Sequence, residues 1–278
     1  MGDVGSDPDR GSFVCSDGAT LAVFEWNATA AGPPIILHHG FTVNTEFNWI
    51  APGIIAALAA TGRRTIAFDA RCHGASEKFL DPARTSRMRM ARDVIEIADH
   101  AGADSYDLAG YSLGGFVAIV SAVEDPRVRR LALCGSCEQL FADQLRHPVL
   151  SGVPAALRAD DPQSVANPVT RAFRLLADRI GSDRLALAAC FEGFNADWQI
   201  SGEAVPKLRI PTLVIGGRDD FIMIGVERLT DVIPDNRLVW TEGDHITALN
   251  DPKFAQELVA FFEFRVPETP SSGDTIPN

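Results

Sequence analysis

Short apolar runs alternate with longer segments of helical periodicity along most of this chain. The apolar runs are PPIILHHG, RTIAFDA, SYDLAG and VRRLALCG in the first half, and RIPTLVIGG and NRLVWTEG in the second. Between and after them, segments such as SRMRMARDVIEIADHAG, LGGFVAIVSAVE and PKFAQELVAFFEF carry apolar residues at helical spacing. Strands that are apolar along their whole length and alternate with helices predict a mostly parallel, doubly wound α/β sheet with helices on both faces.

Two segments depart from this alternation. FVCSDGATLAVFEWN alternates around the turn Ser16-Asp17-Gly18 and predicts an N-terminal β-hairpin. The chain between about Gly135 and Pro206 is instead largely helical, with VTRAFRLLADRIG and DRLALAACFEGFN as its clearest segments. The predicted boundaries are 1–11 for a disordered tail, 12–135 for the first part of the core, 136–206 for a helical cap insertion, 207–265 for the second part of the core and 266–278 for a second disordered tail.

The net charge of the chain limits the classes of partner that it is expected to bind. Its 278 residues include 37 acidic and 25 basic residues, which gives a formal net charge of −12. This charge disfavours nucleic acid and anionic membranes, because both bind through basic patches. No stretch reaches the roughly 18 apolar residues of a transmembrane helix, and the N-terminus does not resemble a secretory signal. We therefore expect a cytoplasmic protein with no membrane span, while its oligomeric state is not indicated.

Cysteine usage agrees with this expectation. The chain has five cysteines, an odd number, and is too long to depend on disulfides for its core. Cys134 and Cys137 form the C-x-x-C sequence CGSC, but no second pair or histidine cluster accompanies them to complete a zinc site. We expect a buried pair at a strand end, with redox chemistry as the alternative.

The sequence GYSLG, from Gly110 to Gly114, carries the first sign of chemistry. It fits G-x-S-x-G and lies between an apolar strand and a helix. A serine on so tight a turn needs flanking glycines, because neighbouring backbone must pass without Cβ clashes. The following helix directs its free N–H groups toward the turn. Ser112 is therefore a candidate nucleophile, and the alternative is an inert serine in a glycine-rich turn.

A serine hydroxyl needs an adjacent base. Loops at the carboxyl ends of parallel strands converge on one edge of the sheet. Three such loops hold Ser112, the pair Asp219 and Asp220, and His245. In this Ser…Asp…His order, a carboxylate can hold the imidazole tautomer while the imidazole accepts the serine proton.

Together these motifs make the chain resemble the α/β-hydrolase-fold serine hydrolases, a family of esterases and lipases. HHGF, DARCHGAS, GYSLGG, VIGGRDD and GDH occur in the order of that family and cover roughly residues 13–264. The resemblance implies the α/β-hydrolase fold and needs neither a metal nor an organic cofactor. The chain departs from the family at Cys72, where glycine is common, so a different or strained turn is expected there.

The resemblance also implies roles for individual residues. The backbone N–H groups of Phe41 and Leu113 correspond to the oxyanion hole of the family. The family acid stands three residues after the glycine that closes its strand. Counted from Gly217, this acid is Asp220; counted from the glycine before it, it is Asp219, and we favour Asp220. By the same resemblance, His39 is expected to organise a loop rather than to act as a base, and His73 is expected to organise a turn.

The insertion is expected to influence the substrate. Its apolar side chains are Phe141, Phe173, Leu176, Phe191, Phe194 and Trp198. Their helical spacing favours core packing over a pocket, although some must line a cavity above Ser112 if the insertion covers the sheet edge. No basic cluster accompanies them, so an apolar or aromatic substrate is favoured. Arg146, Arg158, Arg171 and Arg174 keep an anionic substrate open.

The expected function is that of a serine hydrolase acting on a small-molecule carboxylic ester, with lactones and thioesters as variants. The catalytic residues would be Ser112, Asp220 and His245, with an acyl-enzyme intermediate resolved by water. Related enzymes with the same triad hydrolyse carbon–carbon bonds or act as cofactor-free perhydrolases, and the sequence is compatible with both. A ligand receptor that retains the fold is the alternative from another class.

Overall fold

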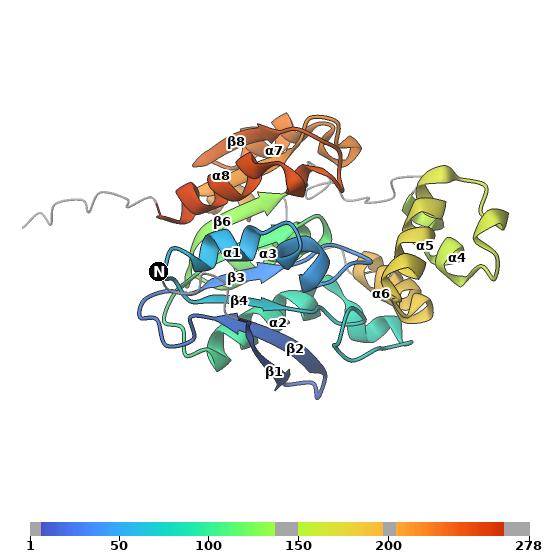
Figure 1. The fold of residues 1–278 in the computed structure, drawn as a ribbon, viewed down its shortest axis with the longest axis horizontal. Coiled ribbons are helices and arrows are strands. Elements are labelled where there is room, and N and C mark those ends of the chain that lie inside the picture. The colour runs from blue at the N-terminus through green and yellow to red at the C-terminus, as the bar shows by residue number, and fades with distance from the viewer. Residues whose placement is uncertain (1–6, 137–149, 197–203, 264–278) are drawn as a thin grey trace, which may run out of the picture.

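One mixed sheet forms the centre of the protein, as the alternation of apolar runs predicts (Figure 1). The computed structural model describes residues 7–136, 150–196 and 204–263. The strands are β1 (Asp9–Val14), β2 (Thr20–Trp26), β3 (Ile35–His38), β4 (Thr65–Phe68), β5 (Tyr106–Tyr111), β6 (Val128–Cys134), β7 (Thr212–Gly217) and β8 (Asn236–Thr241). Their order in the sheet is β1-β2-β4-β3-β5-β6-β7-β8. The predicted doubly wound α/β fold is confirmed.

The two ends of the sheet differ in direction. The predicted N-terminal hairpin is present, because β1 and β2 pair antiparallel, and β2 pairs antiparallel with β4. All pairs from β4 to β8 are parallel. Strand β1 begins at Asp9, which pairs with Glu25, so residues 9–11 of the segment 1–11 that was expected to be disordered belong to a strand. The backbone ladder with β2 extends the hairpin without any apolar signal in its first residues.

Helices cover both faces of the sheet. The α-helices are α1 (Ile54–Ala59), α2 (Arg87–His100), α3 (Leu113–Glu124), α4 (Val153–Arg158), α5 (Pro168–Ile180), α6 (Arg184–Ala196), α7 (Val226–Val232) and α8 (Pro252–Glu263). Helices α1 and α8 belong to one hydrophobic cluster, and α2, α3 and α7 belong to the other. Strand β6 shows how the sheet separates them: Leu131 and Leu133 join one cluster, whereas Ala132 and Cys134 join the other.

Cys134 is fully buried, and burial raises the pKa of its thiol far above the ordinary value. A thiol in this state is not a nucleophile, so Cys134 behaves as a small core residue. The other half of the predicted pair, Cys137, lies outside the described residues, as do the expected tail at 266–278 and residues 1–6 of the first tail.

Helices α4, α5 and α6 lie between β6 and β7 in the chain, and we call them the insertion helices. Figure 1 shows them together beyond the carboxyl ends of the central strands. Their buried residues, such as Leu157, Ala177 and Leu187, extend the cluster that contains α2 and α3. A second connection is polar, because the Ser182 hydroxyl between α5 and α6 donates a hydrogen bond of 3.2 Å to the Thr42 carbonyl.

Helix α6 approaches the core most closely at Gly193. A Cβ at this position would lie 2.0 Å from the carbonyl oxygen of Pro82, in the turn η2 (Pro82–Thr85), and 2.3 Å from Thr85 Oγ1. Only a residue without a side chain permits this approach. The glycine therefore fixes how the insertion helices rest on the core.

We expect Gly193→Ala to destabilise the protein by about 1–3 kcal/mol, because the added methyl overlaps the Pro82 carbonyl. The sign of this change in stability is informative, because a glycine-to-alanine substitution within an unconstrained helix stabilises a protein by about 0.5–1 kcal/mol. Urea denaturation measures the free energy of unfolding. Gly11→Ala is the matched control, because no atom lies within 4 Å of its Cβ position, and it should change stability by less than about 0.5 kcal/mol. A Gly193→Ala protein as stable as the wild type would contradict the packing.

Candidate active site

The turn between β5 and α3 holds Ser112 in a backbone conformation that ordinary residues avoid. Its φ is 53° and its ψ is −115°. A Cβ at Gly110 would lie 2.0 Å from the Gly114 carbonyl oxygen, and one at Gly114 would lie 2.2 Å from the His38 carbonyl oxygen. The G-x-S-x-G spacing is thus a steric requirement of this turn. It leaves Ser112 half-buried at the start of α3, at the edge of the sheet where the strands end.

The three side chains that the sequence singles out form one hydrogen-bonded chain. His245 Nε2 lies 2.9 Å from Ser112 Oγ, and His245 Nδ1 lies 2.7 Å from Asp220 Oδ2. The Asp220 side chain is fully buried, whereas that of His245 is 13% exposed. A buried carboxylate at Nδ1 places the imidazole proton there and leaves Nε2 as the acceptor facing the serine.

The two neighbouring aspartates lie in different environments. Asp220 opens the turn η7 (Phe221–Met223), and its Oδ1 accepts a hydrogen bond of 2.8 Å from the Ile222 N–H while its Oδ2 meets His245. Asp219 is exposed, and among the described residues its one hydrogen bond is that of its backbone N–H to the Gly243 carbonyl, at 3.1 Å. The geometry therefore brings Asp220, not Asp219, against the imidazole.

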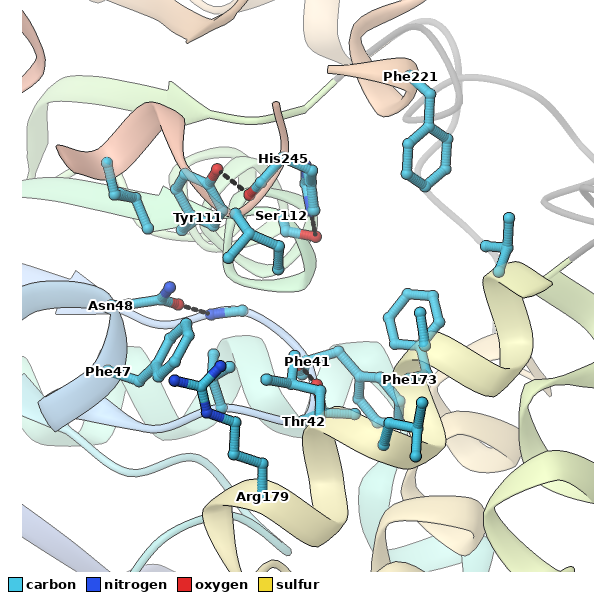
Figure 2. Close-up of a pocket in the computed structure, with 18 of the residues that line it drawn as sticks. Phe41, Thr42, Phe47, Asn48, Tyr111, Ser112, Phe173, Arg179, Phe221 and His245 are labelled. Carbon is cyan, nitrogen blue, oxygen red and sulfur yellow. Dashed lines mark hydrogen bonds between the residues drawn. The ribbon is translucent and has the colours of Figure 1, made fainter. Parts of the chain in front are cut away.

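The loop that carries His245 is held from two sides. Asp244 Oδ1 accepts hydrogen bonds from the Ile246 and Thr247 N–H groups at 3.0 and 2.8 Å, and these contacts, led by those of Thr247, lower the pKa of the Asp244 carboxyl. From the core, the Tyr111 hydroxyl donates a hydrogen bond of 2.6 Å to the His245 carbonyl (Figure 2). Burial raises the pKa of Tyr111 well above its usual value, so it remains a donor.

Tyr111 is a site residue that the sequence does not reveal. It occupies the variable position of G-x-S-x-G, and 134 residues separate it from its partner. No local pattern connects the two, although a tyrosine directly before the serine could have raised the question. Its hydroxyl joins the Ser112 turn to the His245 loop and so fixes the separation of nucleophile and base.

The two backbone N–H groups that the family resemblance suggested lie at the same edge. Leu113 opens α3, where the first N–H groups of a helix have no acceptor within the helix. Phe41 follows Gly40, whose N–H donates to Asn48 Oδ1 at 2.6 Å and whose Cβ position lies 3.4 Å from Ser112 Cβ. Among the hydrogen bonds of residues 7–136, none uses the N–H of Phe41 or of Leu113. Both donors are therefore available to a ligand.

His39 and His73 organise loops, as the family resemblance implied. His39 Nε2 accepts a hydrogen bond from the Ala70 N–H at 2.8 Å, and its Nδ1 donates to the Gly40 carbonyl at 2.7 Å. His73 is used in the same way between the Thr42 N–H, at 3.2 Å, and the Arg71 carbonyl, at 2.7 Å. Each ring donates and accepts once, so both are neutral. Burial lowers the pKa of both imidazoles.

Cys72 shows the strain expected from the missing glycine. Its φ is 68°, in the left-handed region that favours glycine. The side chain is fully buried, and its Sγ accepts a hydrogen bond of 3.4 Å from the Phe79 N–H. A second hydrogen bond of this sulfur, at 3.6 Å, goes to the Phe79 carbonyl. The sulfur thus bonds to the backbone of its own loop and not to the chain of Ser112, His245 and Asp220.

A cavity of about 590 Å³ opens beside Ser112 and His245 (Figure 2). Its lining is mostly apolar, with Phe41, Val43 and Phe47 on the core side and Ala172, Phe173 and Leu176 on helix α5. Among the apolar residues of the insertion, Phe173 and Leu176 line the cavity. Phe194 packs in the hydrophobic core, and both Phe173 and Phe191 pack against it. Phe141 and Trp198 lie outside the described residues.

The part of the chain that the structure describes contains neither a candidate metal site nor a helix that could span a membrane. Within residues 7–136, 150–196 and 204–263, no group of three or more His, Cys, Asp or Glu side chains could hold a metal ion. In the same ranges, every helix is too short or too polar to cross a membrane.

Comparison with known proteins agrees with the fold. The family model described as alpha/beta hydrolase fold matches residues 33–189. The protein named "Putative carbamate hydrolase RutD" of Variovorax paradoxus (strain S110) is 28% identical over 235 residues, covering 76% of this chain and 84% of that protein. The 2-hydroxymuconate semialdehyde hydrolase of Pseudomonas sp. (strain CF600) is 31% identical over 223 residues, covering 70% and 73%. The enol-lactonase of Burkholderia xenovorans LB400 has a similar solved structure, with a TM-score of 0.75, 20% identity and coverage of 91% and 99%.

The buried imidazoles make stability depend on pH. Burial lowers the pKa of His38 to about 3, and it lowers those of His39 and His73 as well. In the unfolded chain each would bind a proton near pH 6.5, so unfolding takes up protons below that value. We expect the free energy of unfolding to fall between pH 7 and pH 5, by up to about 1.4 kcal/mol per pH unit for each buried imidazole.

Urea denaturation across this pH range measures the slope. His39→Gln should remove about a third of it, because one of three contributing imidazoles is lost. His100→Gln, which removes an exposed imidazole at the end of α2, is the control for loss of a histidine outside the buried network. A stability that does not change between pH 7 and pH 5 would contradict the neutral, buried state of these rings.

Proposed function

The chain belongs to the alpha/beta hydrolase family, and from that premise we propose that it is a serine hydrolase that cleaves a carboxylic ester with an apolar or aromatic moiety. One observation carries the proposal: the unbroken hydrogen-bonded chain from Asp220 through His245 to Ser112 at the side of an apolar cavity. A serine in such a chain has the base that it needs to attack a carbonyl carbon.

In the first half of the proposed reaction, Ser112 Oγ forms a bond to the ester carbonyl carbon and its proton moves to His245 Nε2. The distance of 2.9 Å between these two atoms is short enough for that transfer. The carboxylate of Asp220 stabilises the imidazolium that results, because it lies 2.7 Å from Nδ1. The imidazolium then protonates the departing alkoxide, and an acyl-Ser112 ester remains.

In the second half, His245 takes a proton from water, and the water oxygen attacks the acyl carbon. Collapse of the second tetrahedral intermediate returns the proton to Ser112 Oγ and releases the carboxylic acid. In both halves the negative oxygen would be bound by the N–H groups of Phe41 and Leu113. Their proximity to Ser112 and their lack of other acceptors in residues 7–136 support this role. The loss of one such donor in comparable enzymes costs about 2.7–4 kcal/mol of transition-state stabilisation.

The cavity supports an apolar substrate moiety. Phenyl and aliphatic side chains from the core and from α5 make most of its wall, so a bound acyl or alcohol group would leave water for an apolar surface. We propose that the insertion helices act as a cap over Ser112, because α5 supplies one side of this wall. An ester is the simplest substrate of this kind, and lactones and thioesters react by the same steps.

A second candidate is hydrolysis of a carbon–carbon bond, which enzymes of this family carry out with the same three side chains. The 31% identity to 2-hydroxymuconate semialdehyde hydrolase favours it over perhydrolase chemistry. Esters and ring-fission products therefore belong in one substrate panel. Turnover of ring-fission products at a much higher kcat/KM than any ester would assign the second candidate.

Covalent labelling tests the nucleophile directly. A fluorophosphonate reagent should phosphonylate one serine with loss of fluoride, and peptide mass spectrometry should locate the adduct on Ser112. Ser112→Ala should remove both the adduct and the turnover of p-nitrophenyl butyrate. Ser121→Ala is the matched control, because Ser121 lies in the same helix α3 with its hydroxyl bonded to the Val117 carbonyl. Labelling elsewhere, or equal turnover by Ser112→Ala, would overturn the mechanism and favour a ligand receptor.

The two aspartates provide a second test. An amide at Asp220→Asn donates a hydrogen bond to Nδ1, so the imidazole proton moves to Nε2 and the base is lost. We expect kcat for ester hydrolysis to fall by about 10³–10⁴. Asp219→Asn makes the same chemical change one residue away, on an exposed side chain, and should stay within about twofold of the wild type. The reverse ranking would assign the orienting role to Asp219.

A further inference from the structure

The apolar cavity has one cationic side chain on its wall. Among the described residues that line it, Arg179 is the one with a permanent charge, and no carboxylate accompanies it there. Figure 2 shows Arg179 extending from α5, with its guanidinium turned toward Phe47 on the core side of the cavity. Arg179 is an exposed residue overall, yet its side chain also forms part of the wall of this otherwise apolar cavity.

Within the described residues, no ion pair or side-chain hydrogen bond occupies Arg179. The two acids nearest to Arg179 in the sequence are used elsewhere, and the first of them, Asp178, pairs with Arg174 at 3.1 Å and with Arg184 at 3.4 Å. Asp183 caps the start of α6 by accepting from two backbone N–H groups at 3.0 Å. The cation at the cavity is thus not neutralised by the protein residues described around it.

The other arginines of the insertion do not share this position. Arg158 forms an ion pair with Glu192, with Nη2 and Oε2 2.7 Å apart, and Arg174 pairs with Asp178. Arg171 lies on α5 but does not line the cavity. Arg146 lies outside the described residues. The sequence analysis kept an anionic substrate as an alternative because of these four arginines. The arginine that lines the cavity is a different one, Arg179.

Helix α5 places Arg179 at one end of an apolar face that lines the cavity. Residues Pro168, Ala172, Leu175, Leu176 and Arg179 all line the cavity, which follows one face of the helix from its first turn to its last. The face is apolar until its C-terminal end and cationic there. A cation in the last turn of a helix is favourable in itself, but that effect does not require the guanidinium to face a ligand cavity.

We propose that Arg179 is a specificity-determining residue that binds a carboxylate at the far end of the substrate's apolar chain. This inference rests on the proposed ester hydrolysis. The substrate class is a monoester of an aliphatic or aromatic dicarboxylic acid, with its ester carbonyl at Ser112 and its free carboxylate at Arg179. The planar guanidinium matches a carboxylate with two parallel hydrogen bonds.

A single negative charge fits this site better than a phosphate. One guanidinium balances one charge, and no lysine, second arginine or cluster of N–H donors accompanies Arg179 among the described lining residues. A phosphate dianion would enter an acidic protein, of net charge −12, with half of its charge uncompensated. The apolar wall between the two ends requires a hydrocarbon spacer in the substrate.

Matched esters test the proposal. The mono-p-nitrophenyl esters of glutaric, adipic and suberic acid carry a terminal carboxylate, and p-nitrophenyl pentanoate, hexanoate and octanoate are their neutral counterparts. The wild type should show a higher kcat/KM for at least one carboxylate ester than for its counterpart. Arg179→Gln should lower this carboxylate-to-neutral ratio by about five- to tenfold, mainly through KM. Raising NaCl from about 0.05 to about 0.5 M should lower the ratio in the wild type.

Two control variants separate the specific role from a general one. Arg171→Gln removes the same charge from the same helix outside the cavity and should leave the ratio unchanged. Arg179→Lys keeps the charge without the planar fork and should retain part of the ratio. A wild type without preference for any carboxylate ester, or an Arg179→Gln protein with an unchanged ratio, would overturn the proposal.

The same experiment distinguishes failure of the underlying function. If neutral esters are hydrolysed through Ser112 but the ratio is unaffected, the hydrolase stands and the role of Arg179 fails. If no ester is hydrolysed and the fluorophosphonate does not label, the proposed function fails. Calorimetry then decides on Arg179 alone: suberate should bind Ser112→Ala more tightly than it binds the Ser112→Ala/Arg179→Gln double variant. Equal affinities would overturn the carboxylate site.

Discussion

The backbone contact between the end of β5 and the start of α3 is the constraint on which the site depends. A Cβ at Gly110 or at Gly114 would come within 2.0–2.2 Å of a carbonyl oxygen, so the strand, the turn and the helix can close only without side chains there. The closure forces Ser112 to φ 53°, where its hydroxyl faces His245 and the free Leu113 N–H follows it directly. The strained residue is thus the proposed nucleophile, and the packed sheet and helix provide the free energy that keeps it strained.

Two neutral histidines hold the loop of Phe41 and Thr42, and their neutrality affects the charge close to Ser112. His39 and His73 each bridge a backbone N–H and a backbone carbonyl, and Thr42, next to Phe41, donates to His73. The N–H groups on either side of Phe41, those of Gly40 and Thr42, are both hydrogen-bonded, whereas no hydrogen bond of the described residues uses the N–H of Phe41 itself. Since the rings remain neutral, the network adds no cation beside Ser112, and the imidazolium formed on His245 during the proposed reaction would be the new charge there.

The sequence predicted the parts of the site that follow from short-range rules. Ser112 follows from a glycine pattern within five residues, and Asp220 and His245 follow from loops that the parallel topology must bring to one edge. Tyr111 escaped prediction because its partner is 134 residues away. Phe173 and Phe191 both pack against the core cluster, yet of the two it is Phe173 that also lines the cavity. The rotation of each helix about its axis decides this, and periodicity does not report that rotation. For the same reason Arg179 could not be singled out among the arginines of the insertion.

The insertion helices and the core contribute different residues to the site, and the two parts are connected. The core supplies Ser112, Asp220, His245 and the two N–H donors, whereas α5 supplies much of the wall and the proposed carboxylate site. The Ser182 hydroxyl, just after α5, donates to the carbonyl of Thr42 at 3.2 Å, and Thr42 directly follows Phe41. The segment that follows α5 is therefore tied to the loop of a proposed oxyanion donor. Thr42 has a φ of 65°, a costly conformation for a β-branched residue, so the loop keeps it only while neighbouring contacts such as this hydrogen bond hold it there. Changes in the packing of the insertion should consequently reach kcat through Phe41 as well as KM through the cavity wall.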